Sequence, residues 1–127
     1  MSVVMPDLKY TKDHEWVKVE GKLAKMGITD HAQHELTEIV FVELPSADKE
    51  VGKGEVVANV ESVKTVSEVF TPVSGVVKES NGKLVDSPEL LNKDPYGQGW
   101  IVVIEMKDPS ELSGLMSADA YTKLLGE

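Results

Sequence analysis

The sequence predicts a mainly β fold, a small sandwich or barrel with short helices and a helical C-terminus. Short stretches rich in Val, Ile and aromatic residues follow one another closely, with Gly or Pro between them. No helical pattern of about 10–15 residues alternates with these stretches, which disfavours a parallel α/β architecture. At 127 residues the chain is long enough for one core, so we expect a single domain over residues 1–127, with 108–127 as its C-terminal helical segment.

The first half of the chain predicts a hairpin, a short helix and a strand. Residues 15–20 alternate apolar and charged side chains, and residues 23–26 resume the alternation after a glycine. Thr29 or Asp30 is placed to cap a helix about two turns long. The continuous apolar run over residues 39–44 then predicts a strand that is covered on both faces.

The second half predicts short antiparallel strands, then helical pieces around one last strand. Residues 51–80 are rich in Val and interrupted by Gly and Pro. Asn81-Gly82 is the strongest turn signal, because both residues tolerate positive φ. Residues 87–95 predict one short helix with a Ser cap and a Pro stop. Residues 100–105 predict the last strand, and two Ser-initiated helical segments follow it.

Composition limits the possible partners. The formal net charge of −9 repels phosphate backbones and anionic membrane surfaces, so we expect neither nucleic acid nor membrane as a partner. The sequence has no Cys, which excludes disulfides, thiolate metal sites and a cysteine nucleophile in the bare chain. The N-terminal residues have no targeting pattern and no segment approaches membrane-spanning length, so the chain is interpreted as cytoplasmic.

Lys64 lies between two Val-rich segments, residues 56–60 and 66–70. If these segments pair, Lys64 lies at or beside the tip of a hairpin and is accessible to an enzyme that closes over it. A solvated lysine at a turn is the ordinary alternative, and the local pattern does not separate the two. The residues Val63-Lys64 also lack the Gly or Asn that a tight primed turn prefers.

Several segments in order resemble the lipoyl-carrying H protein family of the glycine cleavage system. ESVK, which ends at Lys64, and the later TPVSG resemble the family's lipoyl-lysine hairpin. The other similar segments span Tyr10 to about Glu105 and are YTKDHEWV, GITDHAQ, VFVELP, SPELLN and PYGQGWIVVI. The resemblance implies a hybrid barrel-sandwich fold of the lipoyl/biotinyl type, with lipoic acid in amide linkage to the side-chain nitrogen of Lys64.

The resemblance also implies a carrier subunit and not an enzyme. In the family the arm accepts an aminomethyl group from glycine on a pyridoxal-phosphate glycine decarboxylase and passes its methylene to tetrahydrofolate on an aminomethyltransferase. A dihydrolipoamide dehydrogenase then reoxidises the arm, and a lipoylating enzyme attaches it in the first place. We expect these four enzymes as partners of a monomeric protein, whose missing sulfurs are supplied by the lipoyl group.

The resemblance assigns further residues to the arm. Glu15 matches the family glutamate that holds the amine of the loaded arm. Glu68 and Asp13 stand where the family has an acidic and a small polar residue, so Asp13 is a departure, and a solvated carboxylate is the ordinary alternative for both. His34 is the candidate for contact with the idle arm. His31 and His34 share a helical face, but no third His or any Cys is near them in the sequence, so no metal site is expected.

Three other functions are alternatives to that of a glycine cleavage carrier. A biotin carrier shares the fold but has methionines beside its modified lysine, whereas Val63 and Thr65 flank Lys64. A lipoyl relay, which donates its lipoyl group to other enzymes, needs only an accessible Lys64 and stays open. An unrelated enzyme is disfavoured because the sequence has no Cys nucleophile, GxSxG elbow, phosphate loop or clustered His/carboxylate site.

Overall fold

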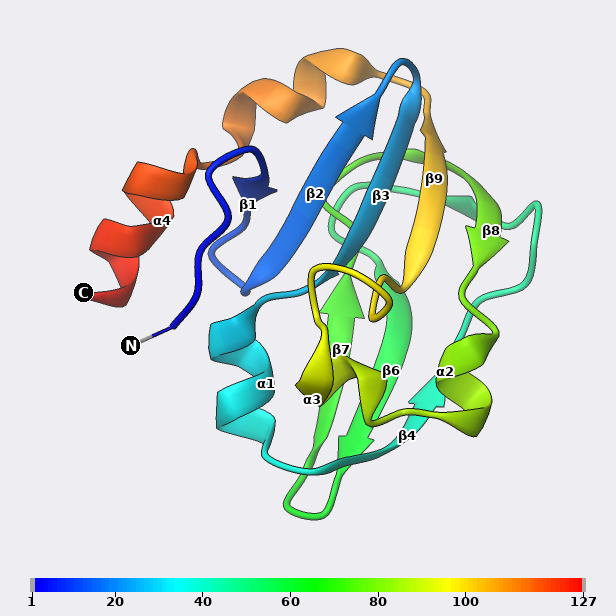
Figure 1. Cartoon of the computed structure of the whole chain (residues 1–127). Helices are drawn as coiled ribbons and strands as arrows, with labels where there is room; N and C mark the ends of the chain where they lie inside the picture. The colour runs from blue at the N-terminus through cyan, green and yellow to red at the C-terminus, as the bar shows by residue number, and fades with distance from the viewer. Residues whose placement is uncertain (1, 127) are drawn as a thin grey trace.

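The computed structural model describes residues 2–126, which form strands and short helices (Figure 1). The strands are β1 Lys9–Tyr10, β2 Glu15–Glu20, β3 Leu23–Ile28, β4 Ile39–Glu43, β5 Glu50–Val51, β6 Val56–Ser62, β7 Val66–Phe70, β8 Gly75–Ser80 and β9 Val102–Met106. The helices are α1 Asp30–Leu36, α2 Lys83–Asp86, α3 Leu90–Lys93, the 3₁₀ helix η1 Pro109–Gly114 and α4 Ala118–Leu125. None of these helices is long and apolar enough to cross a membrane.

The strands form two antiparallel sheets around a shared core. The six-stranded sheet has the order β1-β2-β3-β9-β8-β5, and the three-stranded sheet has the order β4-β6-β7. Met26 and Ile104 of the larger sheet and Val42 and Val60 of the smaller one belong to the same buried cluster. Because each sheet buries one face against the other, the two sheets stabilise each other. The predicted mainly β architecture with short helices and a helical C-terminus is confirmed.

The hairpin and helix predicted for the first half are present. β2 pairs with β3 in a register that sets Glu15 opposite Ile28, and Gly21 makes the turn with a φ of 61°. Of the two predicted caps, Thr29 is the one used: its side chain accepts a hydrogen bond from the Ala32 backbone N–H at 3.2 Å. The cap fixes where α1 begins, directly after β3.

Strand β4 is covered on one face only, so the prediction of a strand buried on both faces is wrong. Ile39 and Val42 are buried in the core, whereas Val40 and Phe41 are 46% and 49% exposed. An antiparallel sheet commonly has one face on the core and the other in water, and the three-stranded sheet follows that pattern. The apolar character of the outer residues therefore does not come from burial within this chain.

The Asn81-Gly82 pair does not form a turn with positive φ. Gly82 has a φ of −60° and is the N-cap residue of α2, and neither residue is among the described residues with positive φ. Asn81 is buried, and its Nδ2 donates to the backbone carbonyls of Gln98 at 2.7 Å and Trp100 at 2.8 Å. The asparagine thus serves a tertiary contact, which the local turn signal does not distinguish from a hairpin.

The helix predicted over residues 87–95 is preceded by a second short helix. Ser87 ends α2, because its backbone N–H bonds to the Lys83 carbonyl, and Glu89 precedes α3. Leu84 of α2 and Leu91 of α3 are both fully buried in the core. Each helix therefore contributes one apolar anchor to the core.

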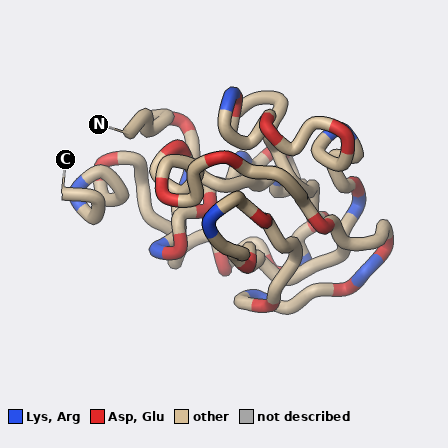
Figure 2. The backbone as a smooth tube through the Cα atoms, turned by 90° about the horizontal axis from the view of Figure 1, so that it is seen from below, with Lys and Arg blue, Asp and Glu red and all other residues tan. Residues whose placement is uncertain are grey.

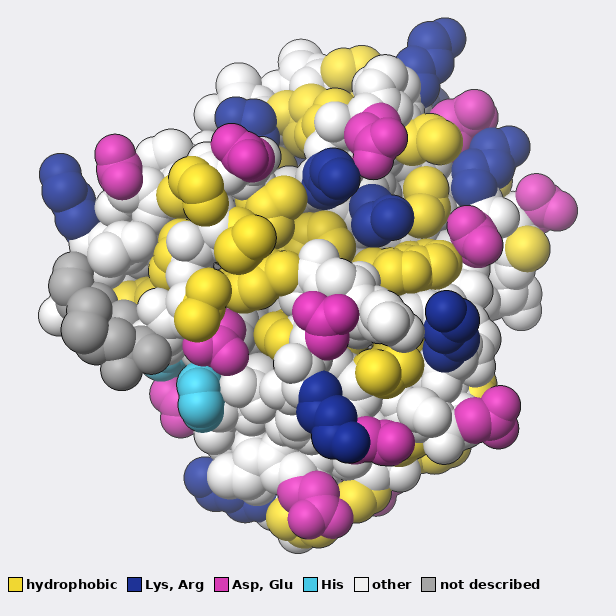
Figure 3. Space-filling model, in the orientation of Figure 1, with side chains coloured by type: hydrophobic (Ala, Val, Ile, Leu, Met, Phe, Trp, Pro, Cys, Tyr) yellow, Lys and Arg dark blue, Asp and Glu magenta, His cyan; other side chains and the backbone are white. Residues whose placement is uncertain are grey.

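The C-terminal segment returns to the first strand. Helix α4 has the predicted Ser cap at Ser117, whereas η1 is capped by Asp108 and not by a serine. The rings of Tyr121 and Tyr10 stack with centroids 4.6 Å apart, and with Trp16 they form a second buried cluster. Figure 3 shows hydrophobic side chains gathered over β1, β2 and β3, with charged side chains scattered around them.

Gly27 allows Trp16 to lie against the sheet. A Cβ atom at position 27 would stand 2.9 Å from Trp16 Nε1, and this indole nitrogen donates to the Pro95 carbonyl at 2.9 Å. At Gly82, by contrast, an added Cβ would meet no atom within 4 Å. The first glycine is required by packing and the second is not.

Gly27→Ala should lower the free energy of unfolding by about 1–3 kcal/mol, because the new methyl group displaces the buried indole. Gly82→Ala is the matched control and should stay within about 0.5 kcal/mol of the parent or rise slightly. Urea unfolding followed by tryptophan fluorescence measures both variants. Equal stabilities of the two variants would contradict the Gly27–Trp16 contact.

Candidate functional site

Lys64 lies at the exposed tip of a hairpin that reaches the lower end of the molecule in Figure 1. Strands β6 and β7 pair antiparallel, with Glu61 opposite Val66 and Asn59 opposite Glu68. The predicted pairing of the two Val-rich segments is therefore confirmed. Because β6 is the central strand of its sheet, the tip is attached to a supported ladder and not to a loose loop.

Ser62 builds the turn that carries Lys64. Its backbone N–H donates to the Thr65 carbonyl at 2.8 Å, and its Oγ accepts from the backbone N–H groups of Lys64 at 3.1 Å and Thr65 at 3.0 Å. The Val63 N–H donates to the Glu38 carbonyl at 3.0 Å, which ties the tip to the entry of β4. A serine side chain that bonds backbone two and three residues ahead replaces the missing Gly or Asn.

A cleft of about 290 Å³ lies between the start of β2, helix α1 and strand β7. It brings together three of the residues singled out in the sequence, Asp13, Glu15 and Glu68, and adds His14 and Glu35. The remaining lining residues are Ile28, Ala32, Leu36, Val60, Ser67 and Val69. Of the described residues that line the cleft, four are carboxylic acids and none is Lys or Arg, so the cleft favours a cationic guest.

The cleft and the hairpin tip are joined by strand β7. Glu68 follows Lys64 by four residues, and β7 begins at Val66. At about 3.3 Å per residue for extended chain, the two Cα atoms are separated by at most about 13 Å. Glu68, at the border of the cleft, therefore lies within the reach of a lysine side chain that has been lengthened by a flexible acyl group.

Glu15 is the most buried carboxyl of the cleft, with 3% of its surface exposed. One carboxyl oxygen accepts from Thr11 Oγ1 at 2.7 Å, and the other accepts from the Phe70 backbone N–H at 3.0 Å. Burial raises the pKa of Glu15 to about 7, although these two hydrogen bonds act to lower it, and the charge of Asp13 raises it further. Glu15 therefore connects the loop before β2 with the end of β7 and titrates near neutral pH.

His14 is held in the cleft by a network that reaches the C-terminal helix. Its Nδ1 lies 2.8 Å from the Tyr121 hydroxyl, which lies 2.7 Å from Thr29 Oγ1. The backbone of His14 has a φ of 69°, an uncommon conformation for a residue with a side chain. Burial and the neighbouring His31 lower the pKa of His14, so its imidazole is neutral at pH 7.

His34 is not among the described residues that line the cleft. Its side chain is 65% exposed, and its Nε2 lies 3.6 Å from Asp30 Oδ2. Figure 3 accordingly shows histidine atoms at the surface over α1. The polar residue of α1 that does line the cleft is Glu35, whose Oε1 lies 3.2 Å from His31 Nε2. The predicted arm contact of His34 therefore has no support from the geometry.

Sequence reasoning missed three residues of this site, namely Ser62, His14 and Glu35. The first has a recognisable signal, because a serine two residues before the lysine is a common turn former. The other two depend on tertiary structure: the His14 ring lies 4.6 Å from that of His31 although the two are far apart in the sequence. Within residues 2–126, no group of three or more His, Cys, Asp or Glu side chains is arranged to hold a metal ion.

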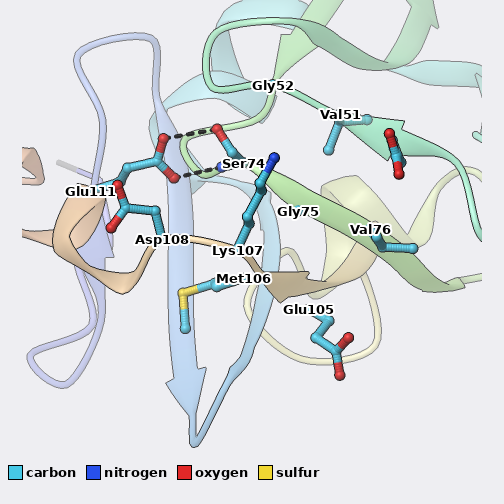
Figure 4. A pocket seen from close by; sticks show the side chains of 11 residues that line it. Val51, Gly52, Ser74, Gly75, Val76, Glu105, Met106, Lys107, Asp108 and Glu111 are labelled. Carbon is cyan, nitrogen blue, oxygen red and sulfur yellow. Dashed lines mark hydrogen bonds between the residues drawn. The ribbon is translucent and has the colours of Figure 1, made fainter.

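A larger hollow, of about 650 Å³, lies where β8 begins and β9 ends, at the opposite end of the molecule from the hairpin tip (Figures 1 and 4). The Glu111 carboxylate at its border accepts from the Ser74 backbone N–H at 2.7 Å and from Ser74 Oγ at 2.8 Å. This carboxylate is thus engaged in holding η1 against β8. None of the predicted site residues lines this hollow.

Comparison with known proteins gives consistent results for sequence and structure. A family model described as "Glycine cleavage H-protein" matches residues 8–127. Glycine cleavage system H proteins from Staphylococcus saprophyticus and Staphylococcus haemolyticus are each 55% identical over 124 residues, which cover 98% of both chains. The crystal structure of a glycine cleavage system H protein from Mycobacterium marinum has a TM-score of 0.90 and 35% identity, and covers 98% of this chain and 100% of that one. The match confirms the predicted fold class.

Glu15→Gln should remove the contribution that protonation of Glu15 makes to the pH dependence of the free energy of unfolding. The folded pKa of about 7 exceeds the ordinary 4.5, so the folded state binds more protons between these values and stability falls as pH rises through that window. The fall is on the order of 3 kcal/mol, since one pKa unit corresponds to about 1.4 kcal/mol. The stability of the variant relative to the parent should therefore rise across the window.

Urea unfolding at a series of pH values measures this difference. Glu20→Gln, which removes an exposed carboxyl from the same strand, is the matched control. A constant difference between Glu15→Gln and the parent from about pH 4 to 8 would contradict the raised pKa of a buried Glu15.

Proposed function

The chain belongs to the glycine cleavage H-protein family, and from that premise we propose that it is a lipoylated carrier of the aminomethyl group taken from glycine. It would receive this group on a pyridoxal-phosphate glycine decarboxylase and deliver it to a tetrahydrofolate-dependent aminomethyltransferase, and then present its arm to dihydrolipoamide dehydrogenase. The observation that carries the proposal is the exposed Lys64 at a supported tip, one strand away from an acidic cleft.

Lys64 fits the attachment of lipoic acid. Its side chain extends from an exposed turn that Ser62 orders, and a lipoylating enzyme needs access to such a turn from several sides. When bound, the lipoyl group supplies the redox-active sulfurs to which the aminomethyl group attaches, and a chain without Cys has no other source of them. The protein's own contribution is therefore to position and protect the arm.

The acidic cleft suits the primary amine that the aminomethyl group carries. An amine is cationic at neutral pH, and charge-assisted hydrogen bonds to carboxylates are stronger than neutral ones. Asp13, Glu15, Glu35 and Glu68 all border the same cleft. We therefore propose that these carboxylates bind the amine of the cargo, with Glu15 as the most buried of them.

Glu15 links the arrival of the amine to the local structure. An adjacent cation favours the charged form of a carboxyl group, so the amine lowers the pKa of Glu15 from about 7 and ionises it. An ionised carboxylate accepts stronger hydrogen bonds from Thr11 Oγ1 and from the Phe70 N–H. Cargo binding thus tightens the junction between the loop before β2 and the end of β7.

Every bond-breaking step in this proposal belongs to a partner enzyme. A tethered intermediate reaches successive active sites at a high effective concentration without being released. The carrier needs reach, a protected resting place and surfaces for docking, and not catalytic groups. The acidic cleft also favours this role over that of a lipoyl relay, because a relay carries no amine for the carboxylates to bind.

Lys64→Arg should abolish glycine–bicarbonate exchange in a reconstituted system. Its free energy of unfolding should stay within about 0.5 kcal/mol of the parent's, because the side chain is exposed. Intact-mass spectrometry with peptide mapping should find one lipoyl adduct on Lys64 of the parent. An unmodified lysine in lipoate-replete cells, or a biotinyl adduct, would refute the carrier proposal. Unfolding of the variant would show that Lys64 is structural.

Loss of the aminomethyl group from the loaded arm should accelerate about 10-fold in Glu15→Gln and in Glu68→Gln, because a charge-assisted hydrogen bond contributes about 1.5–3 kcal/mol. His34→Ala should leave the rate unchanged, since His34 lies outside the cleft lining. The release of formaldehyde and ammonia from purified loaded protein measures the rate. Faster loss in His34→Ala than in the two carboxyl variants would reassign the cargo site to the surface of α1.

A further inference from the structure

Tyr121 connects the C-terminal helix to the acidic cleft, although it is not among the described residues that line the cleft. Its side chain is fully buried, and its ring stacks on that of Tyr10 with an interplanar angle of 3°. Its hydroxyl lies 2.7 Å from Thr29 Oγ1 and 2.8 Å from His14 Nδ1. Figure 1 shows α4 beside β1, at the edge of the larger sheet. One hydroxyl thus joins α4 to the cap of α1 and to the wall of the cleft.

The hydrogen-bond partners of Thr29 determine the direction of this chain of hydroxyls. Thr29 Oγ1 already accepts the Ala32 backbone N–H at 3.2 Å, so its own proton needs an acceptor. Thr29 is fully buried, and within residues 2–126 the Tyr121 oxygen is the acceptor in reach of that proton. In the arrangement that satisfies both hydroxyls, Thr29 donates to Tyr121 and Tyr121 donates to His14 Nδ1. The neutral imidazole then carries its proton on Nε2.

Protonation of His14 is incompatible with this arrangement. An imidazolium carries protons on both ring nitrogens, so its Nδ1 no longer accepts from Tyr121. Tyr121 would have to turn its proton toward Thr29, and the buried Thr29 hydroxyl would lose its acceptor. Because a buried donor without a partner is costly, the chain of hydroxyls favours the neutral imidazole. Burial of the ring, which lowers the pKa of His14, acts in the same direction.

Most of the charged groups around His14 favour its cation. Carboxyl groups line the same cleft from four parts of the chain: Asp13 in the loop before β2, Glu15 of β2, Glu35 of α1 and Glu68 of β7. The other titratable neighbours are Tyr121 at Nδ1 and His31, whose ring lies 4.6 Å away. Figure 2, which views the molecule from the hairpin end, shows acidic residues on several neighbouring strands and loops. In these surroundings, loss of the hydrogen bond at Nδ1 shifts His14 toward its charged form.

A neutral His14 matters for the cargo of the proposed function, on which this inference rests. The cargo amine is a cation that the carboxyl groups of the cleft bind, and an imidazolium in the same wall would repel it and compete for these groups. We propose that Tyr121 is a positioning residue of the cargo site, whose hydroxyl holds His14 in the neutral Nε2–H form and so keeps the carboxyl groups available to the amine. Helix α4 thus contributes to the cleft without lining it.

Nitrogen-15 NMR of the histidine rings in the full-length unmodified protein tests the assignment, with His14→Asn identifying the signals. We expect the parent to carry the proton on Nε2 of His14, a result that needs no variant. In Tyr121→Phe the protonation midpoint of His14 should rise by about one pH unit, because the hydrogen bond to the neutral form is lost. Tyr10→Phe is the matched control: it removes the other hydroxyl of the stacked pair, whose partners are backbone atoms of Met5, and should leave the midpoint unchanged.

The loaded protein tests the consequence for the cargo, through the release of formaldehyde and ammonia. The rate of aminomethyl loss in Tyr121→Phe, divided by that of the parent, should be near 1 at pH 8 and rise to about 5-fold at pH 6, because the variant gains the imidazolium in this range. For Tyr10→Phe the ratio should stay near 1 at both pH values. In a His14→Asn background, where asparagine tolerates the positive φ, Tyr121→Phe should lose its pH-dependent effect.

Four outcomes would contradict this role of Tyr121. An Nδ1–H tautomer in the parent, or an unchanged His14 midpoint in Tyr121→Phe, overturns the hydrogen bond from Tyr121 to His14. A rate ratio that is equal at pH 6 and pH 8, or one that persists in the His14→Asn background, shows that the hydroxyl acts through the general stability of the fold and not through His14. These four results leave the carrier function intact, whereas a parent protein that is never lipoylated overturns the carrier function and this cargo role with it.

Discussion

The burial of the Glu15 carboxyl is the constraint on which the rest of the site depends. One oxygen holds the loop before β2 through Thr11 and the other holds the end of β7 through the Phe70 N–H, so a single side chain joins the two sheets beside the cleft. Removal from water keeps its pKa near neutrality. The adjacent His14, with its positive φ, extends the same junction to Tyr121 and so to the C-terminal helix. The loop before β2, the end of β7 and helix α4 are therefore connected through Glu15 and the adjacent His14.

The two faces of the three-stranded sheet differ in their environment. The inner face packs against the larger sheet, which makes the hairpin a stiff support for Lys64, and Ser62 orders the turn at its end. Near the lysine, the outer face exposes Phe41 and Val66 on either side of Glu61. The edge of β7 leads from the tip to the acidic cleft, so one strand connects the proposed attachment point with the proposed resting place of the cargo. A carrier requires a rigid attachment site, a flexible arm and a binding site for the end of the arm on its own surface.

The features that depend on local periodicity were predicted from the sequence. The alternation in β2 and β3, the cap at Thr29 and the hairpin around Lys64 all follow from neighbouring residues. The apolar run in β4 did not reveal that the outer face of the strand is exposed. An apolar sequence does not show whether a face of a strand is covered by the core or lies at the surface. Asn81 was misassigned because its amide bonds to distant carbonyls. Glu35, and not the predicted His34, reaches the cleft, since a shift of one residue on a helix changes the direction of a side chain by about 100°.

The most direct test of the account is the titration of Glu15 itself. Carbon-13 NMR of selectively labelled glutamate carboxyls, assigned by Glu15→Gln, reports the pKa of this group without any unfolding. We expect a midpoint near 7 in the protein without cargo and a lower midpoint once the aminomethyl amine is loaded on the arm. A midpoint near the ordinary 4.5 in the unloaded protein, or one that loading leaves unchanged, would contradict a buried carboxyl that receives the cationic cargo.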